Sequence, residues 1–131
     1  MIYIGTDIVQ ISSFAAQIAD RASVFVEQTF TQHEQMYAYK IALGKPEQHL
    51  AVRYAAKEAV IKAWSSSFFG RAPMITNPDL REIEVQKDAF GRPRIVLHGT
   101  IFLKMNDPVI QISLSHDGDY AIATALVQER T

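Results

Sequence analysis

The sequence predicts an α+β domain in which helices pack on antiparallel strands, and three observations support this prediction. An apolar strand opens the chain, a long alanine-rich helix occupies its middle, and two segments with hairpin patterns follow. Helices that precede hairpins are typical of α+β domains. Because the 131 residues are 48% hydrophobic and no linker-like stretch divides them, we expect one domain over residues 1–131.

The first element is a strand over residues 2–11. Isoleucine and valine surround Asp7 on both sides of the alternation, which predicts a strand buried on both faces. Asp7 is then a carboxylate among apolar neighbours, where an acid is costly unless it is paired, protonated or bound to a metal. Ser12 and Ser13 are expected to cap a helix that begins near Phe14.

The next elements are three helices. A short helix is expected through VFVEQ, residues 24–28. The stretch TQHE, residues 31–34, has the pattern of a capping box, and the helix that follows should run to Leu43 before Gly44 and Pro46 end it. The longest helical signal extends from Glu47 to about Ser66, because it is rich in alanine and holds no glycine or proline.

The last third of the chain changes from helical to strand periodicity. Residues 65–80 read as a loop, and the turn DAFGRP then joins two alternating runs into a hairpin between Ile83 and Leu97. A short helix is expected over residues 100–105. The final stretch VIQISLSHDGDYAIATALV predicts a second hairpin with an Asp-Gly turn, which places His116 at the end of a strand.

Composition excludes several classes of function. Thirteen Lys and Arg against fourteen Asp and Glu give a net charge of -1, so no nucleic-acid partner is expected. The absence of cysteine excludes disulfides, thiolate zinc sites and a cysteine nucleophile. No apolar run approaches the roughly 20 residues of a membrane span, and no basic and apolar leader opens the chain. We therefore expect no membrane association and a cytoplasmic location.

Two carboxylates stand out as candidates for chemistry. Glu58 on the long helix shares a face with large side chains and is the second acid in an apolar setting. Asp7 and Glu58 together could hold Mg²⁺, which takes one or two carboxylates plus waters and substrate phosphates. Lys62, with Arg53 and Lys57 further round the helix, would meet those phosphates. A phosphate-transfer or phosphate-binding site follows if the two acids meet in space.

Plainer interpretations of the same residues stay open at this point. Glu58 and Lys62 would also suit a simple i,i+4 ion pair on a helix surface. Asp7 would suit a strand acid bonded to a nearby helix N-terminus, and His116 a surface residue beside a turn. Ser113 and Ser115 next to His116 do not indicate a serine hydrolase, because they lack an orienting geometry along one strand.

Taken together, four stretches resemble the holo-acyl-carrier-protein synthase family, the small phosphopantetheinyl transferases. They are GTDIVQI (5–11), RYAAKEAVIKAW (53–64), FGRPRIVLHG (90–99) and SLSHDGDYAIATALV (113–127). The resemblance implies the 4'-phosphopantetheinyl transferase fold, with helices on an antiparallel sheet and a C-terminal hairpin. It also implies a homotrimer with coenzyme A bound in clefts between subunits.

The activity implied by this resemblance is the Mg²⁺-dependent transfer of 4'-phosphopantetheine from coenzyme A to a serine of an acyl carrier protein, which supports fatty acid biosynthesis. Adenosine 3',5'-bisphosphate is released. The resemblance implies that Asp7 and Glu58 are the metal ligands. It implies catalytic roles for Glu58, Lys62 and His116, and we favour Glu58, or a water that it orients, as the base. Coenzyme A contacts are expected from Arg53, Lys57, Lys62, Ser65 and His116.

Two departures from the family pattern qualify what the resemblance implies. Ser13 stands where relatives have an arginine that grips an acidic carrier, and Arg21 is the only cation in residues 11–28. We therefore expect a carrier domain within a multidomain synthase, such as a type I fatty-acid synthase, because a tethered carrier needs less charge steering. Ser65 to Ser67 replace a glycine-rich turn. The alternative is a non-catalytic relative that binds coenzyme A.

Overall fold

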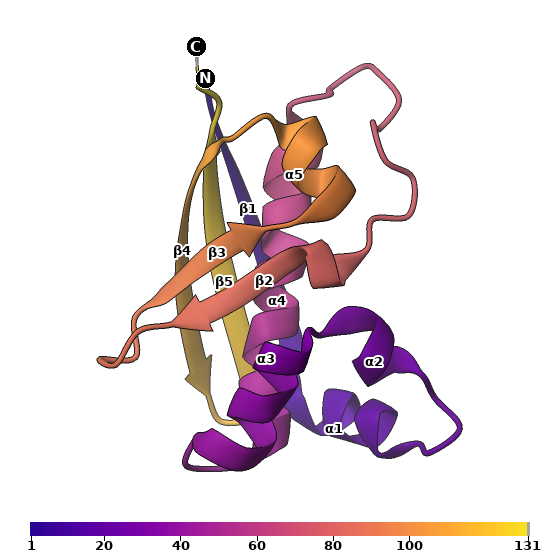
Figure 1. The fold of residues 1–131 in the computed structure, drawn as a ribbon, viewed down its shortest axis with the longest axis vertical. Helices are drawn as coiled ribbons and strands as arrows, with labels where there is room; N and C mark the ends of the chain where they lie inside the picture. Colours follow the sequence, from indigo (N-terminus) through magenta and orange to yellow (C-terminus); the bar gives the residue numbers. More distant parts are fainter. Residues whose placement is uncertain (131) are drawn as a thin grey trace.

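The computed structural model describes residues 1–130 and confirms the α+β prediction, with two antiparallel sheets and helices packed on them (Figure 1). The first sheet has the order β1-β5-β4 and the second is a hairpin of β2 and β3. The strands are β1 (Ile2–Gln10), β2 (Ile83–Lys87), β3 (Pro93–Leu97), β4 (Val109–Asp117) and β5 (Tyr120–Gln128). The helices are α1 (Ile11–Ala19), α2 (Phe25–Thr29), α3 (Gln32–Met36), α4 (Pro46–Ser66) and α5 (Gly99–Met105).

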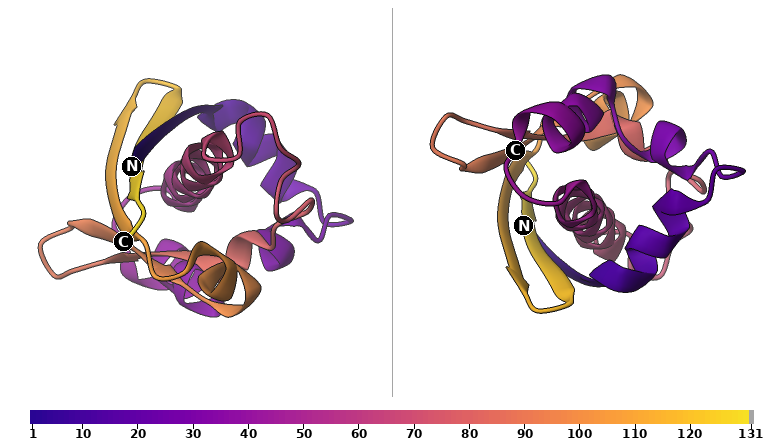
Figure 2. Two further views of the ribbon diagram at one scale, coloured as in Figure 1. Left: turned by 90° about the horizontal axis from the view of Figure 1, so that it is seen from above. Right: turned by 90° about the horizontal axis from the view of Figure 1, so that it is seen from below.

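Helix α4 is the centre of the molecule, and Figure 2 shows it end-on with the three-stranded sheet along one side and other segments around it. Both hydrophobic clusters of the core include residues of α4. Alanines of β5 face alanines of the helix, so the sheet and α4 can pack closely without large side chains between them. The predicted long helix is confirmed and begins one residue earlier than expected, at Pro46.

The contact between β1 and α4 depends on Gly5. A Cβ atom at this position would lie 2.1 Å from the backbone oxygen of Ala59 and 2.6 Å from the backbone nitrogen of Ala63. Any side chain would therefore force the strand away from the helix. Because Asp7 follows two residues later on the same side of β1, this close approach brings Asp7 to the helix surface.

One face of the three-stranded sheet is uncovered in the single chain, which corrects the prediction of a strand buried on both sides. Ile2, Ile4 and Ile8 are 55%, 68% and 60% exposed. The alternate residues of β1 face α4. No other segment within residues 1–130 covers the outer face, so alternation in the sequence identified the faces while the apolar composition misled about their burial.

The predicted start of the first helix near Phe14 and its predicted capping by Ser12 and Ser13 were both wrong, because a distant residue caps this helix. Helix α1 follows β1 directly, and its N-cap residue Gln10 makes no capping bond with its side chain. Asp119, in the turn between β4 and β5, instead accepts hydrogen bonds from the backbone nitrogen and the hydroxyl of Ser12. Ser13 donates to Gln10. A distant carboxylate thus supplies the cap that Ser12 and Ser13 were expected to supply.

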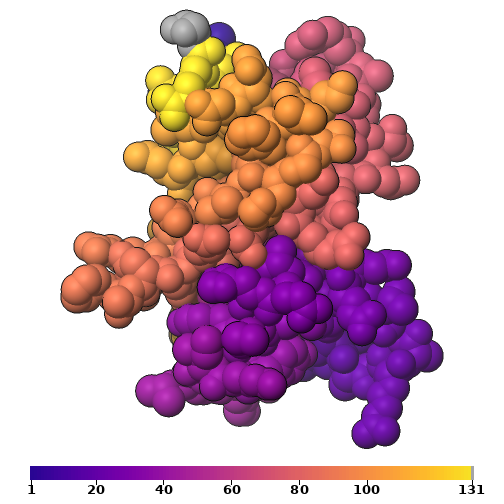
Figure 3. All heavy atoms as spheres, viewed as in Figure 1, coloured from indigo at the N-terminus to yellow at the C-terminus, as the bar shows by residue number. Residues whose placement is uncertain are grey.

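The predicted helix from the capping box to Leu43 forms in two parts. Thr31 and Glu34 make the reciprocal capping bonds, as predicted, at the start of α3. The chain then continues through a π-helical turn over Tyr37–Ile41. The two hairpins and the short helix α5 lie where the sequence placed them. The tip of the β2–β3 hairpin projects from the body of the molecule in Figure 3, and no helix within residues 1–130 is long and apolar enough to cross a membrane.

Candidate active site

The exposed stripe of α4 carries the candidate site. Between Leu50 and Trp64, the middle of this helix is almost entirely buried, and the side chains that reach the surface recur every three or four residues. They are Tyr54, Glu58, Ile61 and Lys62, and Ser65 continues the stripe beyond Trp64. Their spacing places them on one helix face. A buried helix with one polar stripe presents its functional groups on a rigid support.

Asp7 and Lys62 meet across the contact between β1 and α4. The Nζ atom of Lys62 lies 2.8 Å from Oδ1 of Asp7 and also donates to the backbone oxygen of Thr6 at 3.1 Å. The Asp7 side chain is 16% exposed, whereas that of Lys62 is 54% exposed. Asp7 is therefore paired with Lys62 of α4. Its bond to this lysine side chain does not fit the plainer interpretation, in which Asp7 accepts from a helix N-terminus.

Glu58 lies close enough to Asp7 for the two carboxylates to repel each other. Partial burial raises the pKa of Glu58, and the charge of Asp7 raises it further, while Tyr54 and Lys62 act in the opposite direction. Burial and the same two acids raise the pKa of Tyr54 to about 12. The structure thus gathers Asp7, Glu58, Lys62 and Tyr54 at one place, although sequence reasoning had treated Tyr54 only as a large neighbour.

The donor set of this place fits a hard divalent cation. Two carboxylates from separate elements lie near enough for the charge of Asp7 to raise the pKa of Glu58, and a bound cation would offset that repulsion. Within residues 1–130, no group of three or more His, Cys, Asp or Glu side chains could hold a metal ion. A site with only two carboxylates suits Mg²⁺, which proteins bind through one or two carboxylates while waters and phosphates complete its shell.

Arg53 and Lys57 do not reach this surface, and the prediction that they contact coenzyme A is not supported. Both are buried, and Nζ of Lys57 lies 2.7 Å from Oε1 of Glu34 and 2.8 Å from the backbone oxygen of Leu80. Arg53 donates to the backbone oxygen of His49, and its guanidinium lies over the Tyr37 ring at 4.5 Å. Burial lowers the pKa of Lys57, and the charge of Glu34 opposes that shift. Arg53 and Lys57 therefore make contacts in the protein interior and are not part of the exposed stripe.

His116 lies on the opposite edge of the sheet from Asp7. It pairs with Ala121 on β5, which in turn pairs with Val9 on β1. Two strand spacings, about 10 Å, therefore separate β4 from β1. His116 is exposed at the end of its strand, as predicted, but a single chain does not bring it to Asp7 and Glu58.

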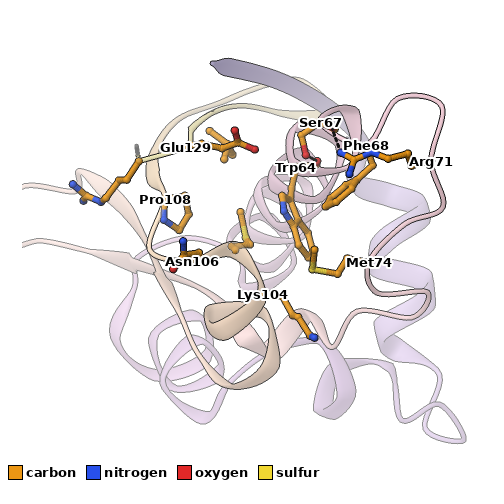
Figure 4. Close-up of a pocket in the computed structure, with 12 residues that line it drawn as sticks. Trp64, Ser67, Phe68, Arg71, Met74, Lys104, Asn106, Pro108 and Glu129 are labelled. Atoms are coloured by element: carbon orange, nitrogen blue, oxygen red, sulfur yellow. Dashed lines mark hydrogen bonds between the residues drawn. The ribbon is translucent and has the colours of Figure 1, made fainter.

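Two cavities adjoin the C-terminal end of α4. One of about 250 Å³ lies beside Ile61 and Ser65 and is closed by residues 73–78. The other, of about 320 Å³, is lined on one side by Trp64 and Phe68 and on the others by Lys104, Asn106 and the end of β5 (Figure 4). Neither contains Asp7 or Glu58. The first continues the exposed stripe of α4 past Ser65 and is therefore the cavity that belongs with the site.

Comparison with known proteins decides the family. The model of the 4'-phosphopantetheinyl transferase superfamily matches residues 3–125. The chain belongs to this superfamily. A holo-[acyl-carrier-protein] synthase of Mycobacterium tuberculosis is 44% identical over 125 residues, which are 95% of this chain and 95% of the relative. The predicted enzyme class, a phosphopantetheinyl transferase of the holo-[acyl-carrier-protein] synthase type, is confirmed.

Solved structures agree in fold over the whole chain. The apo acyl carrier protein synthase of Chronobacterium ammoniagenes superposes with a TM-score of 0.90 at 38% identity and covers 100% of this chain and 99% of its own. The coenzyme A complex of that synthase gives 0.89 at 37% identity with the same coverage. The acyl carrier protein synthase of Mycobacterium tuberculosis gives 0.79 at 42% identity, with 98% and 97% covered.

Proposed function

We propose that this superfamily member transfers 4'-phosphopantetheine from coenzyme A to a serine of an acyl carrier protein in a Mg²⁺-dependent reaction at Asp7, Glu58 and Lys62. The observation that carries the proposal is the convergence of two mutually repelling carboxylates and a lysine on the exposed stripe of α4. The 37%-identical Chronobacterium synthase is described as a complex with coenzyme A. Residues 1–131 would act as one transferase domain.

The reaction requires charge to be neutralised around a pyrophosphate. The carrier serine oxygen attacks the β-phosphorus, a new P–O ester bond forms, and the bond to the bridging oxygen breaks to release adenosine 3',5'-bisphosphate. Mg²⁺, held by Asp7 and Glu58, would supply stabilisation of the developing charge. Lys62, more than half exposed beside Asp7, would bind a phosphate oxygen.

Glu58 is also the proposed acceptor of the serine proton, directly or through a water that it orients. Its raised pKa makes it a better base than an ordinary surface glutamate. Ser65, one helical turn after Ile61, opens onto the adjoining cavity of about 250 Å³, whose Ile61, Trp64 and Phe68 walls suit the largely uncharged pantetheine arm. We assign Ser65 and this cavity to coenzyme A on that basis.

The assembly that we propose is a homotrimer with sites between subunits. The outer face of the sheet exposes a contiguous apolar surface from β1 and β5, made of Ile2, Ile4, Ile8, Tyr120 and Ile122. Exposed apolar surface of this kind marks an interface. We further propose that His116 of a neighbouring subunit completes the site, because the His116 of the same chain lies two strands away from Asp7.

The carrier is proposed to be a domain of a multidomain synthase, such as a type I fatty-acid synthase. Helix α1 has no acidic residue in its first turn and no basic residue in its last, and Ser13 is exposed on it. A neutral helix gives little electrostatic steering, which a tethered carrier at high effective concentration does not need. Equal turnover of a free acidic carrier and of a synthase-embedded carrier would contradict this part of the proposal.

The test is to incubate the protein with coenzyme A, Mg²⁺ and an apo acyl carrier protein and to weigh the carrier by mass spectrometry. We expect a gain of one phosphopantetheine, lost in Asp7→Asn, in Glu58→Gln and after chelation of the metal. Asp107→Asn removes an exposed carboxylate away from the site and should retain activity. Full activity in chelator would contradict the metal role. Binding of coenzyme A without transfer to any carrier would favour the non-catalytic alternative.

A further inference from the structure

The cavity of about 320 Å³ at the C-terminal end of α4 has no role in the proposed transfer reaction. We call it the α5 cavity, because Lys104, Met105 and Asn106 at the end of α5 form one of its walls. The end of α4, the loop that follows it and the end of β5 form the others (Figure 4). Cavities that hold small molecules have volumes of roughly 300–1,000 Å³. The α5 cavity is therefore large enough for a small ligand of its own.

The inner lining of the α5 cavity is apolar. The rings of Trp64 and Phe68 meet edge-on with their centroids 5.6 Å apart, and the buried side chains of Met105 and Val127 lie beside them. Met74, from the loop after α4, is half-exposed and lies next to Trp64 (Figure 4). Methionine side chains adjust readily to the shape of what they contact. An apolar ligand body would therefore leave water for a lining that can adapt to it.

The rim of the α5 cavity is mainly cationic. Its residues include Arg71, Lys104 and Arg130, against the single carboxylate of Glu129. Arg130 is already paired, because its Nε atom lies 2.7 Å from the backbone oxygen of Asp107 and 3.3 Å from the carboxylate of the same residue. Arg71 and Lys104 are exposed and form no ion pair within residues 1–130. An anion at the rim would therefore meet cations that have no carboxylate partner.

The position of Arg71 joins the charged rim to the apolar lining. Its guanidinium lies 5.2 Å from the centroid of the Phe68 ring, and its Nη2 atom donates to the backbone oxygen of Ser67 at 3.3 Å. Guanidinium has five N–H donors, so others stay available for a ligand oxygen. Asn106, the C-cap residue of α5, adds an amide at the opposite wall. The cavity thus combines an apolar interior with several donors at its opening.

We propose that the α5 cavity binds a small amphipathic carboxylate, whose apolar body lies on the aromatic lining and whose carboxylate lies at the rim with Arg71 and Lys104. This site is separate from the cavity of about 250 Å³ that we assign to coenzyme A. The two cavities share a wall, because Trp64, Phe68 and Met74 line both. A ligand in the α5 cavity therefore changes the surroundings of Trp64, which is the single tryptophan of the chain.

The fluorescence of Trp64 measures this binding without coenzyme A, metal or a carrier. Decanoate is the probe, and it is added to the protein below the concentration at which it forms micelles. We expect a saturable change with decanoate and none with acetate, which has the head group but no apolar body. Decanol, which has the body but no charge, should bind at least two- to fivefold more weakly, since one exposed ion pair contributes roughly that factor.

The absence of a saturable change with decanoate would overturn the inference and leave the proposed function intact. Equal affinities for decanol and decanoate would also overturn it, because the cationic rim would then have no part in binding.

Replacement of rim residues locates the bound decanoate. The double variant Arg71→Met, Lys104→Met keeps long side chains at the rim and removes both charges, so its affinity for decanoate should fall by roughly fivefold or more. Two variants serve as controls and should bind decanoate as the wild type does. Ser65→Ala changes only the coenzyme A cavity, and Lys40→Met removes an exposed lysine of the π-helical turn.

Two results with these variants would contradict the assignment to the α5 cavity. Unchanged affinity in the double variant would show that its cations do not hold the carboxylate. Equal weakening in the double variant and in either control would show that decanoate binds in the coenzyme A cavity or through general charge attraction. Circular dichroism verifies that each variant is folded at the temperature used.

Discussion

At the scale of single residues, two lysines of one helix have opposite roles. Lys57 is fully buried against Glu34, whereas Lys62 is exposed and paired with Asp7. The sequence placed Lys57 further round the helix than Lys62, which lies four residues after Glu58, but it could not show that Lys57 is buried because both lysines lie in the same alanine-rich stretch. What separates them is which side of α4 faces the N-terminal helices and β2, and only the packing of distant segments decides that.

Replacement of each lysine by methionine should separate stability from function. Lys57→Met leaves Glu34 buried without its partner, and we expect the free energy of unfolding to fall by about 3–5 kcal/mol. Lys62→Met removes a largely solvent-exposed pair and should cost less than about 1 kcal/mol, while it raises the KM for coenzyme A. Urea denaturation and steady-state kinetics measure the two effects. A stable Lys57→Met variant with weak coenzyme A binding would restore the original prediction for Lys57.

At the scale of elements, features that depend on residues close in sequence were predicted, and features that depend on distant residues were missed. The capping box at Thr31, the long helix and both hairpins were predicted from local patterns, and they form because their determinants lie within a few residues. The cap of α1 was missed because Asp119 is 107 positions from Ser12. The two carboxylates of the site were recognised as costly residues, but the contact that joins β1 to α4 was not visible in either segment alone.

Gly5 is the residue on which that contact depends, and Gly5→Ala tests it. The added Cβ would overlap the backbone of α4, so β1 must retreat from the helix and carry Asp7 away from Glu58 and Lys62. We expect the free energy of unfolding to fall by about 1–3 kcal/mol. Transfer activity should also fall in protein that is still folded, because Asp7 is displaced. Thermal denaturation and the carrier mass assay give the two values.

Thr6→Ala is a suitable control for the glycine variant. Thr6 is exposed on the other side of β1, and its hydroxyl donates to the backbone oxygen of Ala123. Its loss should cost about 1 kcal/mol without moving the strand relative to α4. If Gly5→Ala and Thr6→Ala lowered activity equally, close approach of the strand would not be what positions Asp7.

At the scale of the whole molecule, the site residues fall into two groups that one chain does not join. Asp7, Glu58, Lys62 and Tyr54 gather on one side of the sheet, and His116 lies on β4 at the other edge. The sequence motifs predicted Asp7, Glu58, Lys62 and His116 but not Tyr54, and the family resemblance alone implied that the site lies in a cleft between subunits. The exposed isoleucines of β1 supply the physical reason to expect another copy, because a lone chain leaves them in water.

Mixing two inactive variants tests whether the site is shared. Glu58→Gln removes an acid from one side of the proposed cleft, and His116→Ala removes the histidine from the other, so each homotrimer should be nearly inactive. In an equal mixture assembled together, about a quarter of the clefts would combine an intact Glu58 with an intact His116 of the neighbour. We expect transfer activity to recover to that fraction in the carrier mass assay. Ile4→Glu, which places a charge on the outer face, should prevent both assembly and recovery in a sedimentation experiment and the same assay. A mixture no more active than its components would show that each chain works with its own residues alone.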